Sequence, residues 1–506
     1  MAYLKAKAAP HSQGANLTTL KACILVLCFA VMQTVPAAIN GFPFIFFDTR
    51  GYNNAGKAVV ETIAGKQWVD EAPVTKATSP ADPSVEQAVA AAPGQRVISM
   101  SRSPYYGALV FVSLQAEALL LVLFQSLIVG YVAWLVVRQI CKENPTKPYL
   151  VIGVICAAVT PLPYFTAYAM PDVFAAVVPL CLFLLCVSKR SLTKTQIVIC
   201  WVILAAAVAI HSSHILLTFG LLVLLALMSL WPRVRPLLSG WLMSFLAFSA
   251  GVSAVFAFAF VSQAVFGSWP QNLPFLTARG IEDGPVAELM ANDCGGYEFA
   301  ICDAAPLDNN SSQLFLWDKN GYYQSADEAT KQRLSDEDFS VFLTAALAEP
   351  VMQIRASVGN ALRQLGMFGL YEFYTAKRVF AESAPHFMNG SNLSRFGASL
   401  AVTGGFPFIF LSTFVYASAV ISLITVAIMF GVRSISNTAM ALAVLILATL
   451  LINAVVCGVL SDPHHRYQAR VIWLLPFLAT LLVFQGAQRA KLVPTQFSAE
   501  NSDATL

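Results

Sequence analysis

Residues 238–266 read LSGWLMSFLAFSAGVSAVFAFAFVSQAVF, an apolar run without a charged side chain. A helix needs about 20 such residues to cross the hydrocarbon core of a bilayer, so this run predicts a transmembrane helix. Nine further segments have the same character. With residues 238–266 included, the ten predicted spans are 22–45, 112–137, 149–169, 172–187, 196–210, 214–231, 238–266, 405–432, 438–460 and 471–487. The fourth and fifth are short, and we expect them to be tilted or partly buried in protein.

The composition of the whole chain agrees with this pattern. Of 506 residues, 57% are hydrophobic and only 12% are charged, whereas an average soluble domain is about 25% charged. The formal net charge of +3 offers no basic excess for nucleic acid. These values exclude a soluble globular protein, a disordered chain and a nucleic-acid binder. The expected fold class is an all-α polytopic membrane protein with about ten transmembrane helices (range nine to twelve) and surface helices in its large loops.

Lysine and arginine gather in one set of short connections between the spans. These connections hold a single acid, Glu143, and the basic residues Arg138, Lys142, Lys147, Lys189, Arg190, Lys194, Arg233, Arg235, Arg433, Arg489 and Lys491. The N-terminal tail adds Lys5 and Lys7. All of them lie on one side if ten spans alternate. Because basic loops stay in the cytoplasm, we expect both termini there. The large loops are then periplasmic in a bacterial inner membrane, or lumenal if the membrane is the endoplasmic reticulum.

Two long connections divide the chain. A seven-span membrane module, 1–266, contains the first loop, 46–107. A loop subdomain follows at 267–404, and a C-terminal three-span module with a cytoplasmic tail occupies 405–506. The hexapeptide GFPFIF occurs at 41–46 and again at 405–410. We interpret both copies as the aromatic composition of a membrane interface.

Two features of the second loop stand out. Cys294 and Cys302 are the only cysteines placed outside the predicted spans and their flanks, and we predict a disulfide between them because that compartment permits oxidation. The stretch 351–373 has apolar residues at helical spacing, with Arg355 and Arg363 between them. It predicts an amphipathic helix on the membrane surface, where these cations either anchor lipid headgroups or hold a lipid-linked phosphate.

Ionisable and aromatic residues gather at the outer ends of the spans, where such groups are costly and often functional. The candidate site residues are Asp48, Arg50, Tyr52, Arg102, Tyr105, Tyr106, Glu117, Asp172, His211, His214, His464, His465, Arg466, Tyr467 and Arg470. Ordinary explanations exist for several of them. Asp172 follows a proline and suits a helix N-cap, Glu117 could pair with an arginine, and the tyrosines and the first two histidines suit a membrane interface.

Asp48 is the strongest candidate, because it directly follows the first span. A carboxylate surrounded by Arg, His and Tyr suits group transfer from a lipid phosphate to a hydroxyl. The carboxylate accepts the proton of the attacking hydroxyl, and the cations stabilise the leaving phosphate. Asp48 is therefore the expected general base.

The arrangement resembles the glycosyltransferase-C superfamily of polytopic membrane enzymes, which includes aminoarabinose transferases and protein O-mannosyltransferases. Asp48 takes the place of the first-loop catalytic acid. Ser103-Pro104-Tyr105-Tyr106 is similar to the segment that ends that loop, His465-Arg466-Tyr467 to a late Arg-Tyr segment, and 348–363 to a surface helix of the second loop. The chain has one acid at Asp48 where many relatives have a pair.

The resemblance implies a polyprenyl-phosphate-linked sugar donor and a lipid, glycan or protein acceptor. Arg50, Arg102, His464, His465, Arg466, Arg355 and Arg363 would be candidates for the donor phosphate, and Tyr52, Tyr105 and Tyr106 for stacking on the sugar. No cofactor and no metal ligand are predicted, although a divalent metal is left open. The sequence has no Walker-type motif, so ATP use is not expected.

Three other functions remain open at this point. A secondary transporter or lipid flippase would need broken helices near the midplane and matching halves, and the sequence shows no such halves. A polysaccharide polymerase or ligase would depend on late-loop Arg and His without the acid at the first span. A non-enzymatic assembly subunit would not need the polar cluster at all.

Overall fold

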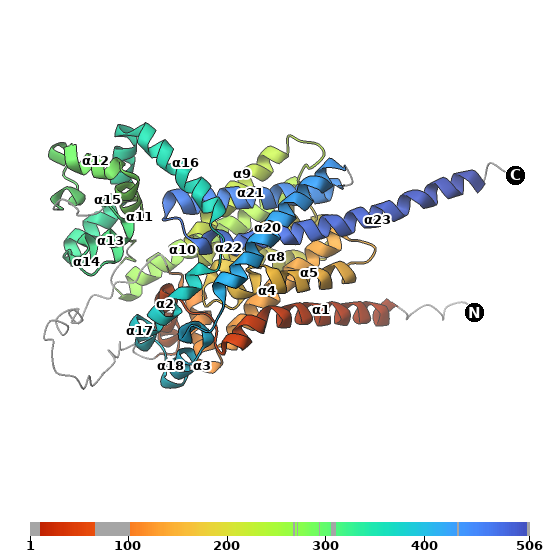
Figure 1. Ribbon diagram of the computed structural model, residues 1–506, viewed down its shortest axis with the longest axis horizontal. Coiled ribbons are helices and arrows are strands. Elements are labelled where there is room, and N and C mark those ends of the chain that lie inside the picture. The colour runs from red at the N-terminus through yellow and green to blue at the C-terminus, as the bar shows by residue number, and fades with distance from the viewer. Residues whose placement is uncertain are drawn as a thin grey trace, which may run out of the picture.

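The computed structural model describes residues 11–502 except 66–101, 267–268, 271, 293, 305–309 and 433–434. Lys5, Lys7 and Arg433 lie outside the described residues. Apart from one bridge between Phe44 and Tyr168, the described residues form helices, turns and irregular segments. Figure 1 shows an elongated bundle of long helices, with a group of shorter helices at one end. We call that end the loop end.

The bundle consists of the helices that the apolar segments predict, together with α22, which lies where an outer turn is expected. They are α1 (His11–Asn40), α4 (Leu119–Ile140), α5 (Thr146–Val159), α7 (Phe174–Cys186), α8 (Lys194–Ile210), α9 (Ser212–Met228), α10 (Leu238–Phe266), α20 (Phe408–Gly431), α21 (Asn437–Leu460), α22 (His465–Ile472) and α23 (Leu474–Ser502). Within the described residues, six helical stretches are long and apolar enough to cross a membrane, and a bent pair could add a seventh. Four shorter apolar helices correspond to the third to sixth predicted spans. The chain is therefore an all-α multi-pass membrane protein.

The boundaries differ from the expected ones at three places. The first helix ends at Asn40 because a glycine with φ of 84°, Gly41, follows it. The expected second span is interrupted at Glu117, and only α4 is long enough to cross. The outer turn expected between the last two spans is helical from His465 on, where α22 begins and leads almost directly into α23.

The fourth predicted span, 172–187, lies at the centre of the bundle as α7. Every residue of α7 from Phe174 to Cys186 is buried, so this helix packs against protein on all sides and has no lipid-facing surface. Its apolar residues meet α4, α8, α9 and α10. The interpretation of this segment as buried in protein is confirmed.

The first loop contributes two short helices at the loop end, α2 (Phe47–Ile63) and α3 (Pro104–Ala116). They cross at two glycines. A Cβ at Gly56 would lie 2.0 Å from the backbone of Gly107, and one at Gly107 would lie 2.2 Å from the carbonyl oxygen of Tyr52. Only glycine permits this approach, which fixes the position of the residues on both helices.

The second loop forms two separate parts. Residues between Leu273 and Ala345 have a core of their own, with Ile281, Phe315 and Val341 buried in it. Its helices are α11 (Phe275–Asp283), α12 (Pro285–Asn292), η4 (Cys294–Gly296), η5 (Ala300–Asp303), α13 (Ser312–Trp317), α14 (Tyr322–Ser325) and α15 (Glu328–Ala348). The disulfide expected between Cys294 and Cys302 is present here.

The remainder of the second loop packs into the main core of the bundle. It contains α16 (Pro350–Gly366), η6 (Tyr371–Thr375), α17 (Ala376–Glu382), η7 (Ala384–His386), α18 (Gly390–Gly397) and α19 (Leu400–Thr403). The predicted subdomain 267–404 thus has a core of its own only in its first part.

The two GFPFIF copies pack against each other in this region. The Phe44 ring lies 5.4 Å from Phe406 and 5.8 Å from Phe408, between ring centroids, and all three rings are buried. Their interpretation as interface residues facing lipid is wrong for these three rings. They join the start of the first loop to the end of the second, and so fix the place of the residues after Phe46.

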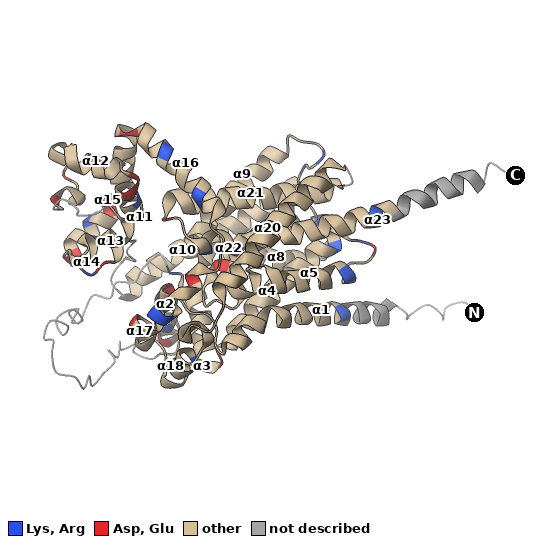
Figure 2. Ribbon diagram, viewed as in Figure 1, with Lys and Arg blue, Asp and Glu red and all other residues tan. Residues whose placement is uncertain are grey.

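Figure 2 shows mainly lysine and arginine among the charged residues at the end of the bundle opposite the loop end, whereas the loop end carries both acids and bases. Residues 138–147, 189–194 and 233–235 all connect antiparallel helices at that basic end. The charge asymmetry that the sequence predicts is therefore present in three dimensions.

Candidate functional site

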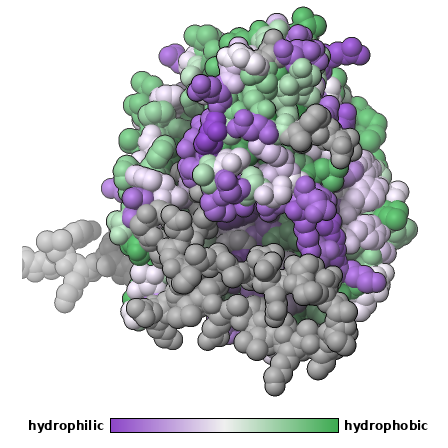
Figure 3. Space-filling view, turned by 90° about the vertical axis from the view of Figure 1, so that its left-hand side faces the viewer, coloured by the Kyte–Doolittle hydropathy of each residue, from purple (hydrophilic) through white to green (hydrophobic). Residues whose placement is uncertain are grey.

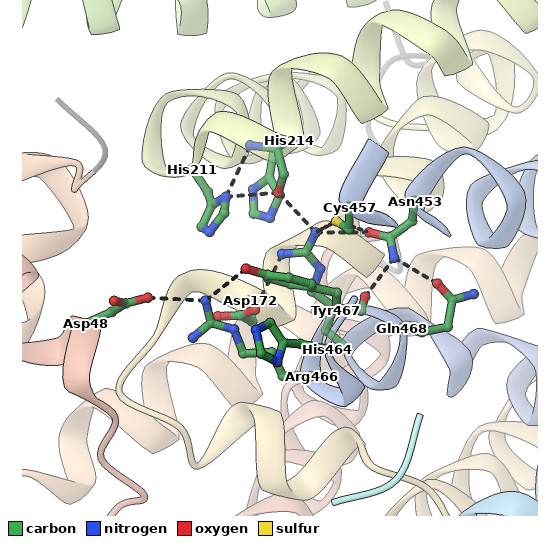
Figure 4. Close-up of polar contacts among 12 residues, drawn as sticks. Asp48, Asp172, His211, His214, Asn453, Cys457, His464, Arg466, Tyr467 and Gln468 are labelled. Carbon is green, nitrogen blue, oxygen red and sulfur yellow. Dashed lines mark hydrogen bonds and ion pairs between the residues drawn. The ribbon is translucent and has the colours of Figure 1, made fainter. Parts of the chain in front are cut away.

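Three segments far apart in sequence meet at the loop end of the bundle. Asp48 lies in the first turn of α2, Arg102 lies two residues before α3, and Arg466 lies in the first turn of α22. One carboxylate oxygen of Asp48 accepts a hydrogen bond from Arg102 Nη2 at 2.5 Å. The other accepts from Arg466 Nη2 at 3.2 Å, a contact that Figure 4 shows. Asp48 is thus held between two guanidinium groups; we call these residues the Asp48 triad.

The start of α2 positions Asp48. The backbone N–H of Phe46 donates to Thr49 Oγ1, and that hydroxyl donates to the carbonyl of Ala169. These bonds tie the first turn of α2 to the segment before α7. A carboxylate in the first turn also gains from the helix dipole, so the position of Asp48 is favourable for its charged form.

A second ion pair lies deeper in the bundle. Arg470 Nη1 is 3.4 Å from Asp172 Oδ1, and both side chains are fully buried. Arg470 Nη2 also donates to Ser213 Oγ at 3.0 Å and to Asn453 Oδ1 at 2.9 Å. Asp172 lies inside a short 3-10 helix, η2 (Pro171–Val173), whose N-cap is Met170, and the N-cap of α7 is Val173, so its interpretation as an N-cap is wrong. Its carboxylate balances a buried cation instead.

Tyr467 separates the two arginines of α22. The Arg466 guanidinium lies 5.0 Å from the centre of the Tyr467 ring, and that of Arg470 lies 5.5 Å from it. Cations favour the face of an aromatic ring. The ring therefore holds both guanidinium groups apart and orients them.

The predicted histidine pair borders the same region. The His211 and His214 rings stack with centroids 4.9 Å apart. His214 Nδ1 bonds to the carbonyl of Ala207, and His211 Nδ1 accepts from the backbone of Ser213, whose hydroxyl meets Arg470. This turn is thereby connected to the deeper ion pair.

The other two histidines belong to a separate network. His464 Nδ1 lies 3.2 Å from Glu372, and its Nε2 lies 3.5 Å from Asp462. Asp462 also meets the buried Arg279 at 3.2 Å, which connects the loop core to this turn. His465 accepts from the backbone N–H of Gly369. Both histidines therefore brace the start of α22, next to Arg466.

Electrostatics favour ionised carboxylates at this surface. Burial acts to raise the pKa of Asp48, but Arg102 and Arg466 outweigh it and lower that pKa to about 2. Burial likewise opposes ionisation of Glu372, and the hydrogen bond from His464 with the nearby cations lowers its pKa nonetheless. The Asp48 triad holds one negative and two positive charges, so it keeps a net positive charge that suits an anion.

Several buried polar atoms around the triad have no protein partner among the described residues. They are Tyr52 OH, Tyr168 OH, Asp172 Oδ2, His214 Nε2, Arg466 Nη1 and Arg470 Nε. A buried polar atom without a partner costs about 1–3 kcal/mol, so this concentration indicates a region that binds water or a polar ligand. Seen from the loop end, the surface has a hollow, and hydrophilic side chains lie along its upper and right-hand edges (Figure 3).

Five predicted residues lie outside this region. Arg50 is exposed on α2. Burial and, after it, the charge of Arg50 lower the pKa of His386. Tyr105 donates to the carbonyl of Ala254 on α10, and Glu117 pairs with Arg395 at 3.0 Å. Arg355 and Arg363 are exposed on α16. The structure brings together Asp48, Tyr52, Arg102, Tyr106, Asp172, His211, His214, Arg466, Tyr467 and Arg470, with His464 and His465 beside them.

Four residues of the region were not candidates from sequence. Asn453 gave a signal, because it is a polar residue inside an apolar span. Tyr168, Glu372 and Ser213 gave none, since their roles arise from contacts with distant segments. Within the described ranges, no group of three or more His, Cys, Asp or Glu side chains is placed to hold a metal ion.

Comparisons with known proteins leave the site to be interpreted from its own geometry. The chain matches no family model, no curated protein and no solved structure.

Proposed function

We propose that this protein is a membrane glycosyltransferase that moves a sugar from a polyprenyl-phosphate donor to a lipid, glycan or protein acceptor at the loop end. The observation that carries the proposal is the Asp48 triad, in which a carboxylate next to a membrane span is held by two arginines. A phosphate can take the place of that carboxylate, because guanidinium groups bind both by the same paired hydrogen bonds.

The reaction follows from these groups. An acceptor hydroxyl attacks the anomeric carbon of the sugar, the bond from that carbon to the phosphate oxygen breaks, and polyprenyl phosphate leaves. The hydroxyl proton passes to the Asp48 carboxylate. Arg102 and Arg466 stabilise the charge that develops on the leaving phosphate. Tyr52 and Tyr168, whose buried hydroxyls lack protein partners, are suited to bind sugar hydroxyls.

Donor binding would also activate the base. In the Asp48 triad, the two arginines lower the pKa of Asp48 to about 2, and a carboxylate of such low proton affinity is a poor base at neutral pH. A donor phosphate competes with Asp48 for both guanidinium groups. Once they turn to the phosphate, the carboxylate loses its partners and its pKa rises, so it becomes able to accept a proton only when donor is present.

The membrane arrangement fits this role. The basic end of the bundle suits the cytoplasm, so we infer that both termini face the cytoplasm and that the triad faces the periplasm of a bacterial inner membrane. A lipid-linked donor would then approach from within the bilayer. The order of Asp48, Arg102 and the late Arg466-Tyr467 along the chain agrees with the resemblance to the glycosyltransferase-C superfamily.

The direct test uses purified protein in proteoliposomes with a panel of polyprenyl-phosphate-linked sugars and membrane lipid extract as acceptor. We expect release of polyprenyl phosphate with at least one donor, and none with Asp48→Asn. Absence of release with every donor, together with uptake of a labelled solute or lipid by the same vesicles, would overturn the proposal in favour of a transporter or flippase.

A further inference from the structure

Helix α16 has its polar and apolar faces reversed, compared with a surface helix of a water-soluble protein. Its buried face is polar: Gln353, Asn360 and Gln364 are at most 9% exposed. Its outward face is apolar, with Val351 and Leu362 exposed by 78% and 64%. A surface helix in water shows the reverse distribution.

The buried polar face of α16 makes specific contacts. The Gln364 side chain donates to the carbonyl of His464 and accepts from its backbone N–H. Asn360 donates to Asp283 at 2.8 Å. A Cβ at Gly458 of α21 would lie 2.8 Å from the Asn360 carbonyl oxygen, so the two helices touch along their backbones. The orientation of α16 is therefore fixed, and its apolar face is held outward.

The outward apolar face continues across a sharp corner onto α15. Phe339, Leu343 and Leu347 follow one another at intervals of four residues and are exposed by 64%, 43% and 72%. The two helices together have the hydropathy of a membrane span, but they meet at an angle of 110°. A straight crossing of the bilayer is excluded by that angle, and an exposed apolar corner remains.

We propose that the corner between α15 and α16 is immersed in the leaflet at the loop end, where lipid acyl chains cover Val351, Ile354, Val358 and Leu362. Polar contacts inside and apolar side chains outside are the pattern of a helix in lipid. The apolar surface is also continuous with a lipid-facing one, since α21, on which α16 packs, exposes Leu451 and Val455.

The charge on this face fits the headgroup layer. Arg355 follows Val351 by one helical turn and lies on the exposed face, with Leu362 two turns further on. A long arginine side chain can lie along apolar surface while its charge reaches the lipid headgroups. The corner thus offers apolar area to the acyl chains and a cation to the layer above them. This inference does not depend on the proposed function.

The test attaches a nitroxide to single cysteines at Ile354, Val358 and Leu362 in protein reconstituted into lipid nanodiscs. Cys23 and Cys28, the two exposed free cysteines, are first replaced by serine. Leu451→Cys, on the exposed face of a span, is the lipid control, and Ala329→Cys, at the far end of α15, is the water control. Collision rates with molecular oxygen and with a water-soluble nickel chelate are measured for each label.

We expect labels at the three α16 positions to collide with oxygen as the Leu451 control does, and to be shielded from nickel. Collision with nickel at the rate of the Ala329 control would place the corner in water and overturn the proposal. Shielding from both reagents would show that protein, either a second copy or a partner, covers this face, and would overturn it equally.

Discussion

Arg466 and Arg470 lie one turn apart on α22, and each holds a different carboxylate, Asp48 at the surface and Asp172 in the interior. Residues four apart on a helix project from the same face. The two pairs differ in exposure, because Asp48 is 18% exposed in its side chain and Asp172 is fully buried. A ligand can therefore reach the Asp48–Arg466 pair, whereas the Asp172–Arg470 pair stabilises the fold. We make separate predictions for the two pairs.

Asp48→Asn should abolish transfer and strengthen donor binding. Loss of a general base lowers the rate by about 10²–10⁴-fold. The asparagine no longer competes for the two arginines, so we expect polyprenyl phosphate to bind about tenfold more tightly, as the loss of one competing charge-assisted bond would produce. Equilibrium binding of radiolabelled polyprenyl phosphate in detergent and turnover in proteoliposomes measure the two effects. Weaker binding in the variant would mean that Asp48 itself contacts the donor.

Arg466→Gln should raise the donor KM and lower kcat, since it removes one of the two cations that bind the phosphate. We expect a combined loss in kcat/KM of about 10²-fold or more, as for the loss of one charge-stabilising group. Arg333→Gln is the matched control, because Arg333 is 48% exposed and forms its ion pairs with Asp303 and Glu337 in the first part of the second loop. Equal kinetics for both variants would contradict a phosphate role for Arg466.

Asp172→Asn should destabilise the protein rather than change its chemistry directly. It leaves Arg470 buried without a counter-charge, and breaking a buried pair costs about 3–5 kcal/mol. The midpoint of thermal unfolding in detergent should fall clearly. The double variant Asp172→Asn/Arg470→Gln should recover part of the loss, because it removes the uncompensated charge. A double variant less stable than both single variants would argue against this account.

The apolar part of the fold was predictable because each membrane span is one continuous run of apolar residues. All ten predicted segments correspond to apolar helices, six of them long enough to cross a bilayer. The interruption at Glu117 was not predictable, because the residues on both sides of it are equally apolar. Hydropathy shows which segments are apolar enough to leave water, and it does not show where a helix is interrupted.

The sequence predicted the site only through one argument, that charged residues at the ends of membrane spans are costly and therefore often functional. That argument selected Asp48, Arg466 and Arg470 correctly as residues of one region, yet it also selected Arg50 and Glu117, which lie outside it. The pairing of each arginine with its carboxylate depends on helix register and on close contacts such as Gly56 with Gly107. Such contacts join distant segments and leave no pattern in a single sequence.

Phe408→Ala should destabilise the protein by about 3–5 kcal/mol, the usual cost of emptying a buried aromatic site. Its ring is 1% exposed and contacts Phe44 and Phe373. Phe410→Ala, two residues further in the same hexapeptide, is the control: that ring is 63% exposed, and we expect a change within about 0.5 kcal/mol. Thermal unfolding in detergent gives both values, and similar losses would contradict the packing of the two hexapeptides.

The Asp48 triad should stabilise the fold with a defined dependence on pH. The pKa of Asp48 is lowered from 3.8 to about 2, so folding favours the charged form, and this contribution is present above the unfolded pKa. It is lost as the pH falls from about 4 through about 2, and its full size is about 2 kcal/mol by linkage. Asp48→Asn removes the titrating group. The stability difference between the natural protein and this variant should stay constant from pH 8 to 5 and shrink toward pH 3, as followed by chemical unfolding in detergent. A difference that instead declines between pH 8 and 6 would mean that Asp48 is not held by its two arginines.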